Sequence, residues 1–297
     1  MKIKGSILET LILLGLADLC DQALVVRSII KVERKFYPTL WSIVEDLSPS
    51  LKKIVTDIKK KILPSGEVDD HASSVLLRLR QEVRRRRQNI IQTLEGLMRD
   101  ANTAVREEFV TIRNGRFVIP VKYNHSKRMR GVVHAYSSSG ATVFMEPLEI
   151  IEEANNLQEL RGKEAQEVTR ILLELTDKLR DQLQELKVAT EAVAELDIIN
   201  AKAKFLEKFR AVIPTIDGDQ TLELSEARHP LLEENLRSSD KNVVPISLRL
   251  DINLPVMIVS GANAGGKTVV LKTAGLLVLM ALSGLPVPAI SARVPFY

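Results

Sequence analysis

A glycine-rich turn near the C-terminal end of the chain has the residue types and spacing of a phosphate-binding loop. The segment IVSGANAGGKTVVLKTAGLL, residues 258–277, predicts an apolar strand, a turn and an apolar helix. Gly261, Gly266, Lys267 and Thr268 complete the pattern G-x-x-x-x-G-K-[ST]. Glycines allow backbone N–H groups to surround phosphates, and the helix adds the positive end of its dipole. We therefore expect ATP to bind here, with Lys267 on its β- and γ-phosphates and the Thr268 hydroxyl on Mg²⁺.

Hydrolysis of a bound nucleotide requires groups beyond this loop. An acidic residue on a later strand helps to hold Mg²⁺, and a further group orients the attacking water. Residues 269–297 contain neither Asp nor Glu, so Lys267 and Thr268 are the catalytic candidates that the loop itself offers. We expect the chain to bind ATP but not to hydrolyse it alone. Turnover would require an upstream acid such as Asp251 to serve the metal.

Two cationic clusters are candidates for contacts with a polyanion. The first is the run Arg84, Arg85, Arg86 and Arg87, within a predicted helix over residues 69–100. Because a helix spreads four consecutive residues around its circumference, this run is either a solvated surface or in part a phosphate-binding patch. The second consists of Lys127, Arg128 and Arg130 in the segment NHSKRMRG. We expect this segment to form a hairpin tip, where long side chains reach phosphates at little cost in packing, and we favour it as the more important contact.

Other polar residues receive no catalytic assignment. Four glutamates are spaced for a solvated helix start rather than for paired catalytic carboxylates: Glu146, Glu149, Glu152 and Glu153. His125 and His134 flank the basic turn, but no Cys or acidic cluster completes a metal site there. The segment SSSG, residues 137–140, predicts a polar turn near His134 without an acidic group to orient the imidazole. We assign no nucleophile.

The N-terminal part of the chain predicts helices interrupted by a small antiparallel β-module. Residues 1–105 have helical periodicity. Residues 109–147 instead alternate apolar and polar side chains with a period of two. Asn114 and Gly115 between such stretches are the strongest short signal for a hairpin. The expected strands of the module cover residues 110–113, 117–122, 132–136 and 142–145.

Residues 148–209 predict one long helix or a broken pair of helices. Five leucines follow a heptad-like spacing: Leu172, Leu175, Leu179, Leu183 and Leu186. At 1.5 Å per residue, such a stretch spans up to about 90 Å and is typical of a lever arm. The segment IPTIDGD, residues 213–219, ends it and marks a domain boundary. Predicted strands at 222–224, 246–250 and 256–259 then lead to the glycine-rich loop.

The composition is that of an ordinary globular protein. Of the 297 residues, 45% are hydrophobic, 27% charged and 4% aromatic, and the net charge is +4. So few aromatic residues provide few stacking platforms for single-stranded nucleic acid, and the charge permits a polyanionic partner without requiring one. The one cysteine, Cys20, excludes an internal disulfide and fits a reducing compartment. The first 22 residues predict an amphipathic helix and not a signal peptide, so we expect a cytoplasmic protein without a membrane partner.

Several stretches resemble the MutS family of DNA mismatch and recombination proteins. The segments SEARHPLLEENL, VVPISLRLD and IVSGANAGGKTVVLKTAGLLVLMALSGLPVPA are similar, in this order, to the ATPase domain of that family. The segments TIRNGRFVIPVK and GVVHAYSSSGATVFMEPLEIIEEANNLQEL resemble its bacterial branch called MutS-two, which lacks the N-terminal mismatch-reading domain. The resemblance covers nearly the whole chain and is weakest over residues 1–70.

The resemblance implies a set of nucleotide-binding residues. The ATP loop of the family maps onto Gly261, Ala262, Asn263, Ala264, Gly265, Gly266, Lys267 and Thr268. Ala262 replaces the proline that is usual there, which should alter the stiffness of the loop and not its cradle. Val243 stands where mismatch-repair relatives often carry an aromatic residue against the adenine, so the resemblance implies aliphatic packing. For His229, in the stretch ARHP, we favour a structural role over a nucleotide contact.

The resemblance also implies a fold. We expect a mostly α-helical core and lever domain over residues 1–215, with its β-module at 109–147. A truncated α/β P-loop ATPase domain follows over residues 216–297. Compared with the family, the chain ends before the acidic strand, the Ser-rich signature, the coiled coil and the Smr nuclease domain. We therefore expect it to be the N-terminal part of a longer protein, with an exposed strand edge and an uncovered apolar helix near its end.

Finally, the resemblance implies a function. Proteins similar to this chain are ATP-dependent DNA clamps implicated in suppressing homologous recombination. We expect a homodimer that uses ATP and Mg²⁺ and closes on branched or duplex DNA. Two alternatives stay open: a ribosome-associated ATPase that acts on stalled or collided ribosomes through rRNA, and a helical scaffold with an empty nucleotide loop.

Overall fold

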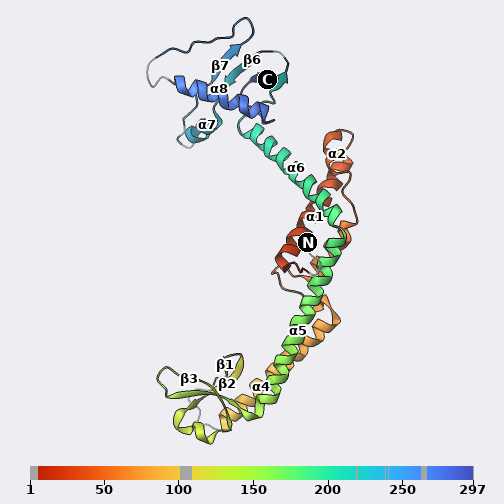
Figure 1. Cartoon of the computed structure of the whole chain (residues 1–297), viewed down its shortest axis with the longest axis vertical. Helices are drawn as coiled ribbons and strands as arrows, with labels where there is room; N and C mark the ends of the chain where they lie inside the picture. The colour runs from red at the N-terminus through yellow and green to blue at the C-terminus, as the bar shows by residue number, and fades with distance from the viewer. Residues whose placement is uncertain are drawn as a thin grey trace. The chain divides into compact units, whose positions relative to one another are not determined.

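The computed structural model describes residues 6–100, 109–218, 220–237, 239, 241–261 and 266–296, with the backbone alone at positions 127, 128 and 217 (Figure 1). The chain forms two compact units, Met1–Thr190 and Glu191–Tyr297, and the division falls within the helix Leu183–Lys208. The predicted fold class is confirmed: helices with a small antiparallel sheet precede a partial α/β region with a mixed sheet.

Helices dominate the first unit because their apolar residues recur on one face. The helices are α1 (Thr10–Val32), α2 (Pro38–Val44), α3 (Leu51–Lys61), α4 (Ser74–Asp100) and α5 (Leu148–Asp181), with a short 3-10 helix η1 (Asp70–Ala72) before α4. Leu51, Ile54 and Ile58 bury one face of α3, which packs along α1. Full burial of each such side chain contributes roughly 1.5–3 kcal/mol.

The β-module forms a four-stranded antiparallel sheet. Its strands are β1 (Thr111–Arg113), β2 (Arg116–Lys122), β3 (Gly131–Tyr136) and β4 (Thr142–Pro147), in the order β1-β2-β4-β3. Asn114 and Gly115 have φ of 51° and 75°, the left-handed values that a two-residue hairpin turn requires, so this predicted turn is confirmed. Phe117, Ile119 and Met145 pack against the adjoining ends of α4 and α5, so the module and these helices share one core.

The segment between β2 and β3 is not a hairpin turn, which corrects the sequence-based expectation. β4 lies between the two strands and pairs with both. The 3-10 helix η2 (Tyr123–Arg128) follows β2 in the connection to the far side of β4. Strand order of this kind depends on contacts between distant residues, whereas the local pattern indicates only where each strand begins and ends.

The long helical stretch is a broken pair of helices, one of the two predicted forms. α5 ends at Asp181 and α6 (Leu183–Lys208) begins two residues later. Gln182, with φ −108° and ψ 27°, leaves the helical conformation, and its N–H donates to the carbonyl of Leu179 at 3.2 Å. The break therefore falls within the heptad-like leucine series.

The second unit combines a mixed sheet with one long apolar helix. It contains β5 (Thr215–Asp217), β6 (Leu222–Ala227), α7 (Pro230–Arg237), β7 (Ile246–Leu250), α8 (Lys267–Leu282) and β8 (Ser291–Pro295). The sheet order is β5-β8-β6-β7, with β5 and β8 parallel and the other pairs antiparallel. Leu277 and Ala281 of α8 join Leu224 and Val294 of the sheet in the core.

The expected strand at 256–259 is not formed. These residues have no ladder partner in the part of the chain that the structure describes, and Val256 and Ile258 are 76% and 88% exposed. An apolar, β-branched run favours a strand, but a strand exists only where a neighbour satisfies its N–H and C=O groups. The apolar helix near the end of the chain, expected to be uncovered, is covered on one face: Leu277 and Ala281 of α8 are buried, whereas Leu271 and Leu279 are exposed.

None of the helices that the structure describes is long and apolar enough to cross a membrane.

Candidate nucleotide and nucleic-acid sites

The described ends of the glycine-rich loop both have backbone conformations that favour glycine. Gly266 precedes α8 in the left-handed conformation, with φ 85°, and Gly261 has φ 154°. A Cβ built on either glycine meets no atom within 4 Å, so both face open space. Ala262, Asn263, Ala264 and Gly265 lie outside the described residues.

Lys267, at the start of α8, contacts the other described end of the loop. Its Nζ donates to the carbonyl oxygen of Gly261 at 2.6 Å, and it forms no ion pair with a carboxylate among the described residues. Thr268 is exposed beside it, and the first turn of α8 contains no acidic residue. The positive end of the helix dipole, the ammonium and the hydroxyl are thus close in the chain and uncompensated by acidic side chains of α8, which suits an anion with a bound divalent cation.

Asp251, the upstream acid considered as a metal ligand, stabilises a turn. Its carboxylate accepts hydrogen bonds from the backbone N–H groups of Asn253 and Leu254, at 2.9 and 3.0 Å, and Arg249 lies 3.3 Å away. These two backbone hydrogen bonds, and then Arg249, lower the pKa of Asp251. The ionised carboxylate therefore closes the chain reversal after β7.

Val243 and His229 lie on either side of α7. Val243 is half-buried in the loop between α7 and β7, and its role against the adenine stays a prediction. His229 precedes α7, and its Nδ1 accepts from the N–H of Leu232 at 3.4 Å. This contact satisfies one of the backbone donors that a helix start leaves free, which is a structural role.

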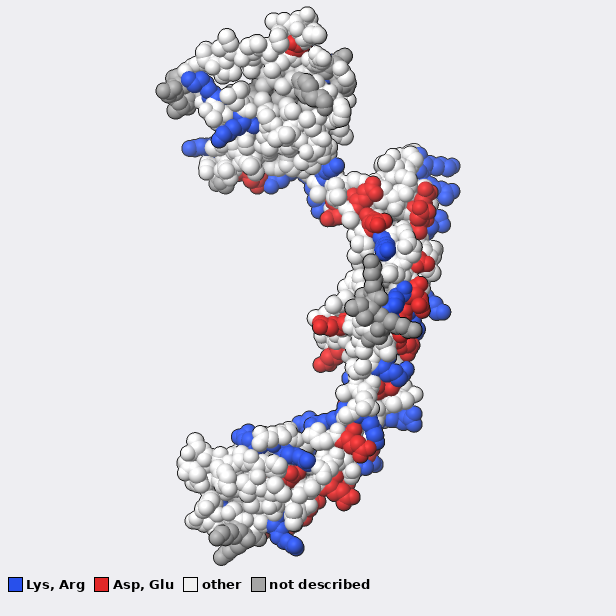
Figure 2. All heavy atoms as spheres, in the orientation of Figure 1, with Lys and Arg blue, Asp and Glu red and all other residues white. Residues whose placement is uncertain are grey.

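Most of the arginine run is neutralised within the protein. Arg84 pairs with Asp70 at 2.6 Å, and Arg85 pairs with Glu82 at 2.8 Å. Arg86 pairs with Glu82 at 2.9 Å and with Glu153 of α5 at 2.6 Å. Figure 2 shows acidic and basic side chains interspersed along the helical part of the first unit. Arg84 and Arg86 therefore link α4 to η1 and to α5, whereas Arg85 pairs within α4.

Arg87 differs from its three neighbours. It is exposed and has no ion pair with any residue that the structure describes. It lines a hollow of about 610 Å³ between α4 and β1, and a second of about 380 Å³ along α4 that Arg84 also lines. The structure therefore brings the end of the arginine run next to the first strand of the β-module.

The basic turn of the module is only partly defined. Its backbone forms the 3-10 helix η2, and the side chains of Lys127 and Arg128 lie outside the described atoms. Arg130 is exposed, and its carbonyl accepts from the N–H of Leu148 at the start of α5. The segment thus carries exposed positive charge beside the start of α5.

Glu146 is buried, which corrects its assignment to a solvated helix start. Strand β4 continues through Glu146 to Pro147, and α5 begins only at Leu148. The Glu146 side chain is 4% exposed, and its Oε2 lies 2.7 Å from Nε2 of His134. Arg116 approaches the other carboxylate oxygen at 3.5 Å.

His134 therefore has an acidic partner, contrary to expectation. A β-bulge in β3, between Val133 and Ala135, adds His134 as an extra residue opposite β4. A bulge re-aims a side chain, here toward a carboxylate twelve residues later in the sequence. The one signal for this pair was the strand pattern of TVFMEP, which extends past Met145.

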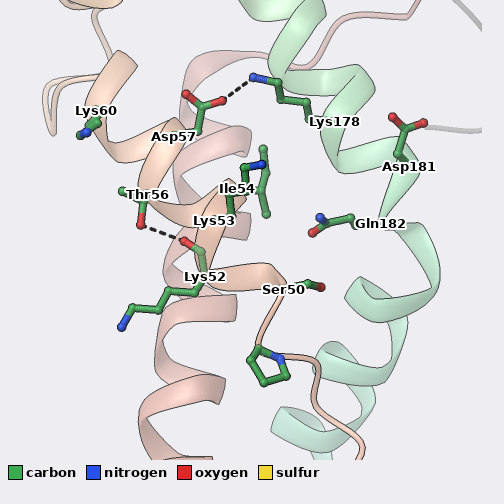
Figure 3. A pocket seen from close by; sticks show the side chains of 11 residues that line it. Ser50, Lys52, Lys53, Ile54, Thr56, Asp57, Lys60, Lys178, Asp181 and Gln182 are labelled. Atoms are coloured by element: carbon green, nitrogen blue, oxygen red, sulfur yellow. Dashed lines mark hydrogen bonds and ion pairs between the residues drawn. The ribbon is translucent and has the colours of Figure 1, made fainter.

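A separate cavity of about 960 Å³ lies between α3 and the end of α5 (Figure 3). Lysines and aspartates line it together, and Lys178 and Asp57 bond to one another at 2.6 Å across it. Figure 3 shows Gln182, at the break between α5 and α6, pointing toward α3. No predicted site residue lines this cavity. In the described part of the chain, no group of three or more His, Cys, Asp or Glu side chains is arranged to hold a metal.

Comparisons with known proteins identify relatives. No protein-family model matches the chain. The chain is 38% identical over 288 residues to a protein of Pelotomaculum thermopropionicum named Endonuclease MutS2, covering 96% of this chain and 36% of that protein. Proteins of the same name from Finegoldia magna and Fusobacterium nucleatum are each 39% identical, covering 79% and 81% of this chain and 29% and 30% of those proteins. The chain thus spans about a third of the length of these curated relatives.

Proposed function

Because the chain belongs to the MutS2 branch of the MutS family, we propose that it supplies the ATP-binding loop and a nucleic-acid-binding surface of an ATP-dependent clamp. The clamp acts on branched or recombining DNA and thereby suppresses homologous recombination. It works as a cytoplasmic homodimer. The name of the relatives says that they are endonucleases, and we assign strand cleavage to no residue of this chain.

The observation that carries the proposal is the loop around Lys267. Two features support binding of a nucleoside triphosphate. Gly266 is left-handed at the start of a 16-residue helix, and the Lys267 ammonium has no carboxylate partner among the described residues. Gly261 through Thr268 would hold the phosphates, and the Thr268 hydroxyl would ligate Mg²⁺. Val243 would pack against the adenine. Mg²⁺ supplies charge neutralisation when bound.

Contact with nucleic acid is proposed at the junction of α4 and the β-module. Arg87 is exposed at this junction, and Arg130 is exposed beside the start of α5. Neither forms an ion pair with a carboxylate of the described residues, and Lys127 and Arg128 add charge in the same module. Arg84, Arg85 and Arg86 already have carboxylate partners, so they contribute less to binding than the run of four suggests. Phosphate contacts of this kind give affinity without sequence preference, which suits a protein that recognises the shape of DNA.

The test measures the affinity of the intact protein for a four-way DNA junction, a linear duplex of equal length and ribosomes, each with and without ATP and Mg²⁺. We expect the junction to bind more tightly than the duplex, and ATP to change the Kd of the junction. Tighter binding to ribosomes than to the junction would replace the proposal with a ribosome-associated ATPase. Failure to bind a fluorescent ATP analogue would leave a helical scaffold.

A further inference from the structure

The C-terminal end of α6 is held by two arginines that come from the segment around α7. Nη2 of Arg228 donates to the carbonyl oxygens of Phe209 and Arg210, at 2.5 and 3.2 Å. Nη2 of Arg237 donates to the carbonyl oxygen of Lys208 at 3.2 Å. The last carbonyls of a helix lack intrahelical donors and form the negative end of its dipole, so guanidinium groups are well suited to this position.

Acidic residues of α7 keep both arginines in place. The Glu233 carboxylate lies 3.2 Å from Nε of Arg228 and 3.4 Å from Nη2 of Arg237. The Glu233 side chain is largely shielded from solvent, at 18% exposure. Next to it, Glu234 pairs with Lys208 of α6 at 2.8 Å. Each arginine is therefore bonded at more than one point, which fixes its orientation more firmly than a single surface ion pair would.

Apolar contacts make the same end of α6 part of the second unit. The rings of Phe205 and Phe209 lie 4.6 Å apart, and Arg237 stacks over Phe209 at 5.9 Å. Phe205 and Val212 pack against the core beneath α8.

The chain reversal after α6 is also tightly held. Arg210 adopts φ 44°, a strained value for a residue other than glycine, and the N–H of Ala211 bonds back to Leu206. The backbone N–H of Arg228 donates to the carbonyl of Pro288 at 2.8 Å. Arg228 is therefore anchored to the body of the unit by its backbone and to α6 by its side chain.

The same α7 leads directly to the predicted adenine contact. The N–H of Lys241 bonds to the carbonyl of Leu236, so the loop that follows starts from the end of α7. Val243 comes two residues later. Any displacement of Val243 by a nucleotide therefore acts on a short connection to the helix that carries Glu233 and Arg237.

We propose that Arg228 is the joint between the nucleotide loop and α6: through it, binding of ATP in the loop changes the stability of the C-terminal end of α6. Glu233 orients Arg228, and Arg237 assists it. Arg228 is a positioning residue: its side chain bonds to Glu233 and to the carbonyls of Phe209 and Arg210, and we assign it no contact with the nucleotide. The inference rests on the proposed function, because it needs ATP to bind at Lys267. It gives the stretch ARHP a role as the coupling between α7 and the lever helix.

The test compares the intact protein with its Arg228→Lys and Arg237→Lys variants, using Arg249→Lys in the same unit as the matched control. Arg249 pairs with Asp251 at the turn after β7. Hydrogen–deuterium exchange at the amides of residues 205–212 is measured with and without ATP and Mg²⁺. A fluorescent ATP analogue gives the nucleotide affinity of each protein, and circular dichroism checks folding.

We expect ATP to change the exchange rate at residues 205–212 by about 5-fold or more in the parent and in Arg249→Lys, in line with typical coupling between sites. In Arg228→Lys the change should vanish while the Kd of the ATP analogue stays within about 2-fold, since a lysine keeps the charge but cannot span both carbonyls and Glu233. Arg237→Lys should reduce the change in part, and it provides the test if Arg228→Lys does not fold.

Different outcomes separate the two ideas. A parent that binds no ATP analogue contradicts the proposed function and the joint together. A parent that binds it without any change at residues 205–212 overturns the joint alone. The joint is also wrong if Arg228→Lys keeps the full ATP response, or if it loses ATP binding, because Arg228 would then belong to the nucleotide site itself.

Discussion

The Nζ of Lys267 lies 2.6 Å from the carbonyl oxygen of Gly261, so this lysine bridges the two described ends of the loop. A single neutral acceptor is a weak partner for an ammonium, and the triphosphate of a nucleotide offers stronger, charged ones. The bond to Gly261 is thus one that a nucleotide can replace without breaking an ion pair with any residue that the structure describes.

Replacing this lysine tests the nucleotide loop. Lys267→Ala should weaken binding of a fluorescent ATP analogue by about 10- to 100-fold, the size expected when charge-assisted hydrogen bonds are removed. Helicity by circular dichroism should stay the same, because the ammonium does not belong to the core. Lys272→Ala, an exposed position on the same helix, is the matched control. Equal affinity of Lys267→Ala and the parent would show that the loop does not cradle phosphates.

Sequence patterns predicted local features and missed those that depend on distant residues. The hairpin at Asn114 and Gly115 was predictable because left-handed φ angles are a property of those two residues. The position of β4 between β2 and β3 was not, since any order of antiparallel strands satisfies the same alternation. Val256 and Ile258 carry a strong strand pattern without a strand, because backbone pairing requires a neighbour.

The same distinction applies to the candidate sites. The spacing of the glycine-rich loop is itself the signal for a phosphate cradle. The ion pairs of the arginine run cannot be read from local sequence: Arg84 pairs with Asp70, 14 residues earlier, and Arg86 with Glu153, 67 residues later. The contact between Glu146 and His134 likewise depends on a bulge in another strand, which turns the histidine toward the carboxylate.

Arg87 and Arg86 should respond differently to substitution. Arg87→Gln should reduce the slope of log affinity against log salt for duplex DNA by about 0.9, the value for a single neutralised phosphate. Arg86→Gln is the matched control, since it replaces the neighbouring arginine in the same way. Arg86 is already paired with Glu82 and Glu153 and is not expected to contact a phosphate, so its replacement should leave the slope unchanged. Fluorescence anisotropy across a salt series measures both. An effect of Arg86→Gln equal to that of Arg87→Gln would mean that the ion pairs open on binding.

The basic turn of the β-module makes a separate prediction. Replacing Lys127, Arg128 and Arg130 with Ser should flatten the same salt slope, by about 0.9 for each phosphate that these side chains neutralise, and weaken all DNA sequences alike. The midpoint of thermal unfolding should not change, because Arg130 is exposed and has no ion pair with a described carboxylate. Titration of branched DNA and of ribosomes is the measurement. An unchanged slope on both would leave Arg87 as the candidate contact.

Glu167 on α5 should make the stability of the first unit depend on pH. Hydrogen bonds from Arg170, and then from Ser73, lower the pKa of its carboxyl to about 2. The Glu167 side chain is 10% exposed and lies 2.8 Å from Nη2 of Arg170. In the unfolded chain a glutamate titrates near its ordinary pKa of about 4.3. Because the folded pKa is the lower one, the stabilisation is fully present above about pH 5 and is lost as the pH falls toward about 2.

Glu167→Gln should therefore lower the free energy of unfolding by about 1–2 kcal/mol at pH 7, after allowance for screening of Arg170 by solvent. The difference from the parent should shrink steadily between about pH 5 and pH 2. Urea unfolding followed by the fluorescence of Trp41, the single tryptophan of the chain, reports on the unit that contains Glu167. Glu159→Gln is the control on the same helix, because its pair with Lys163 is exposed on both sides and should contribute far less to stability. A difference between Glu167→Gln and the parent that stays constant from pH 7 to pH 2 would show that the carboxylate is not held ionised by these hydrogen bonds.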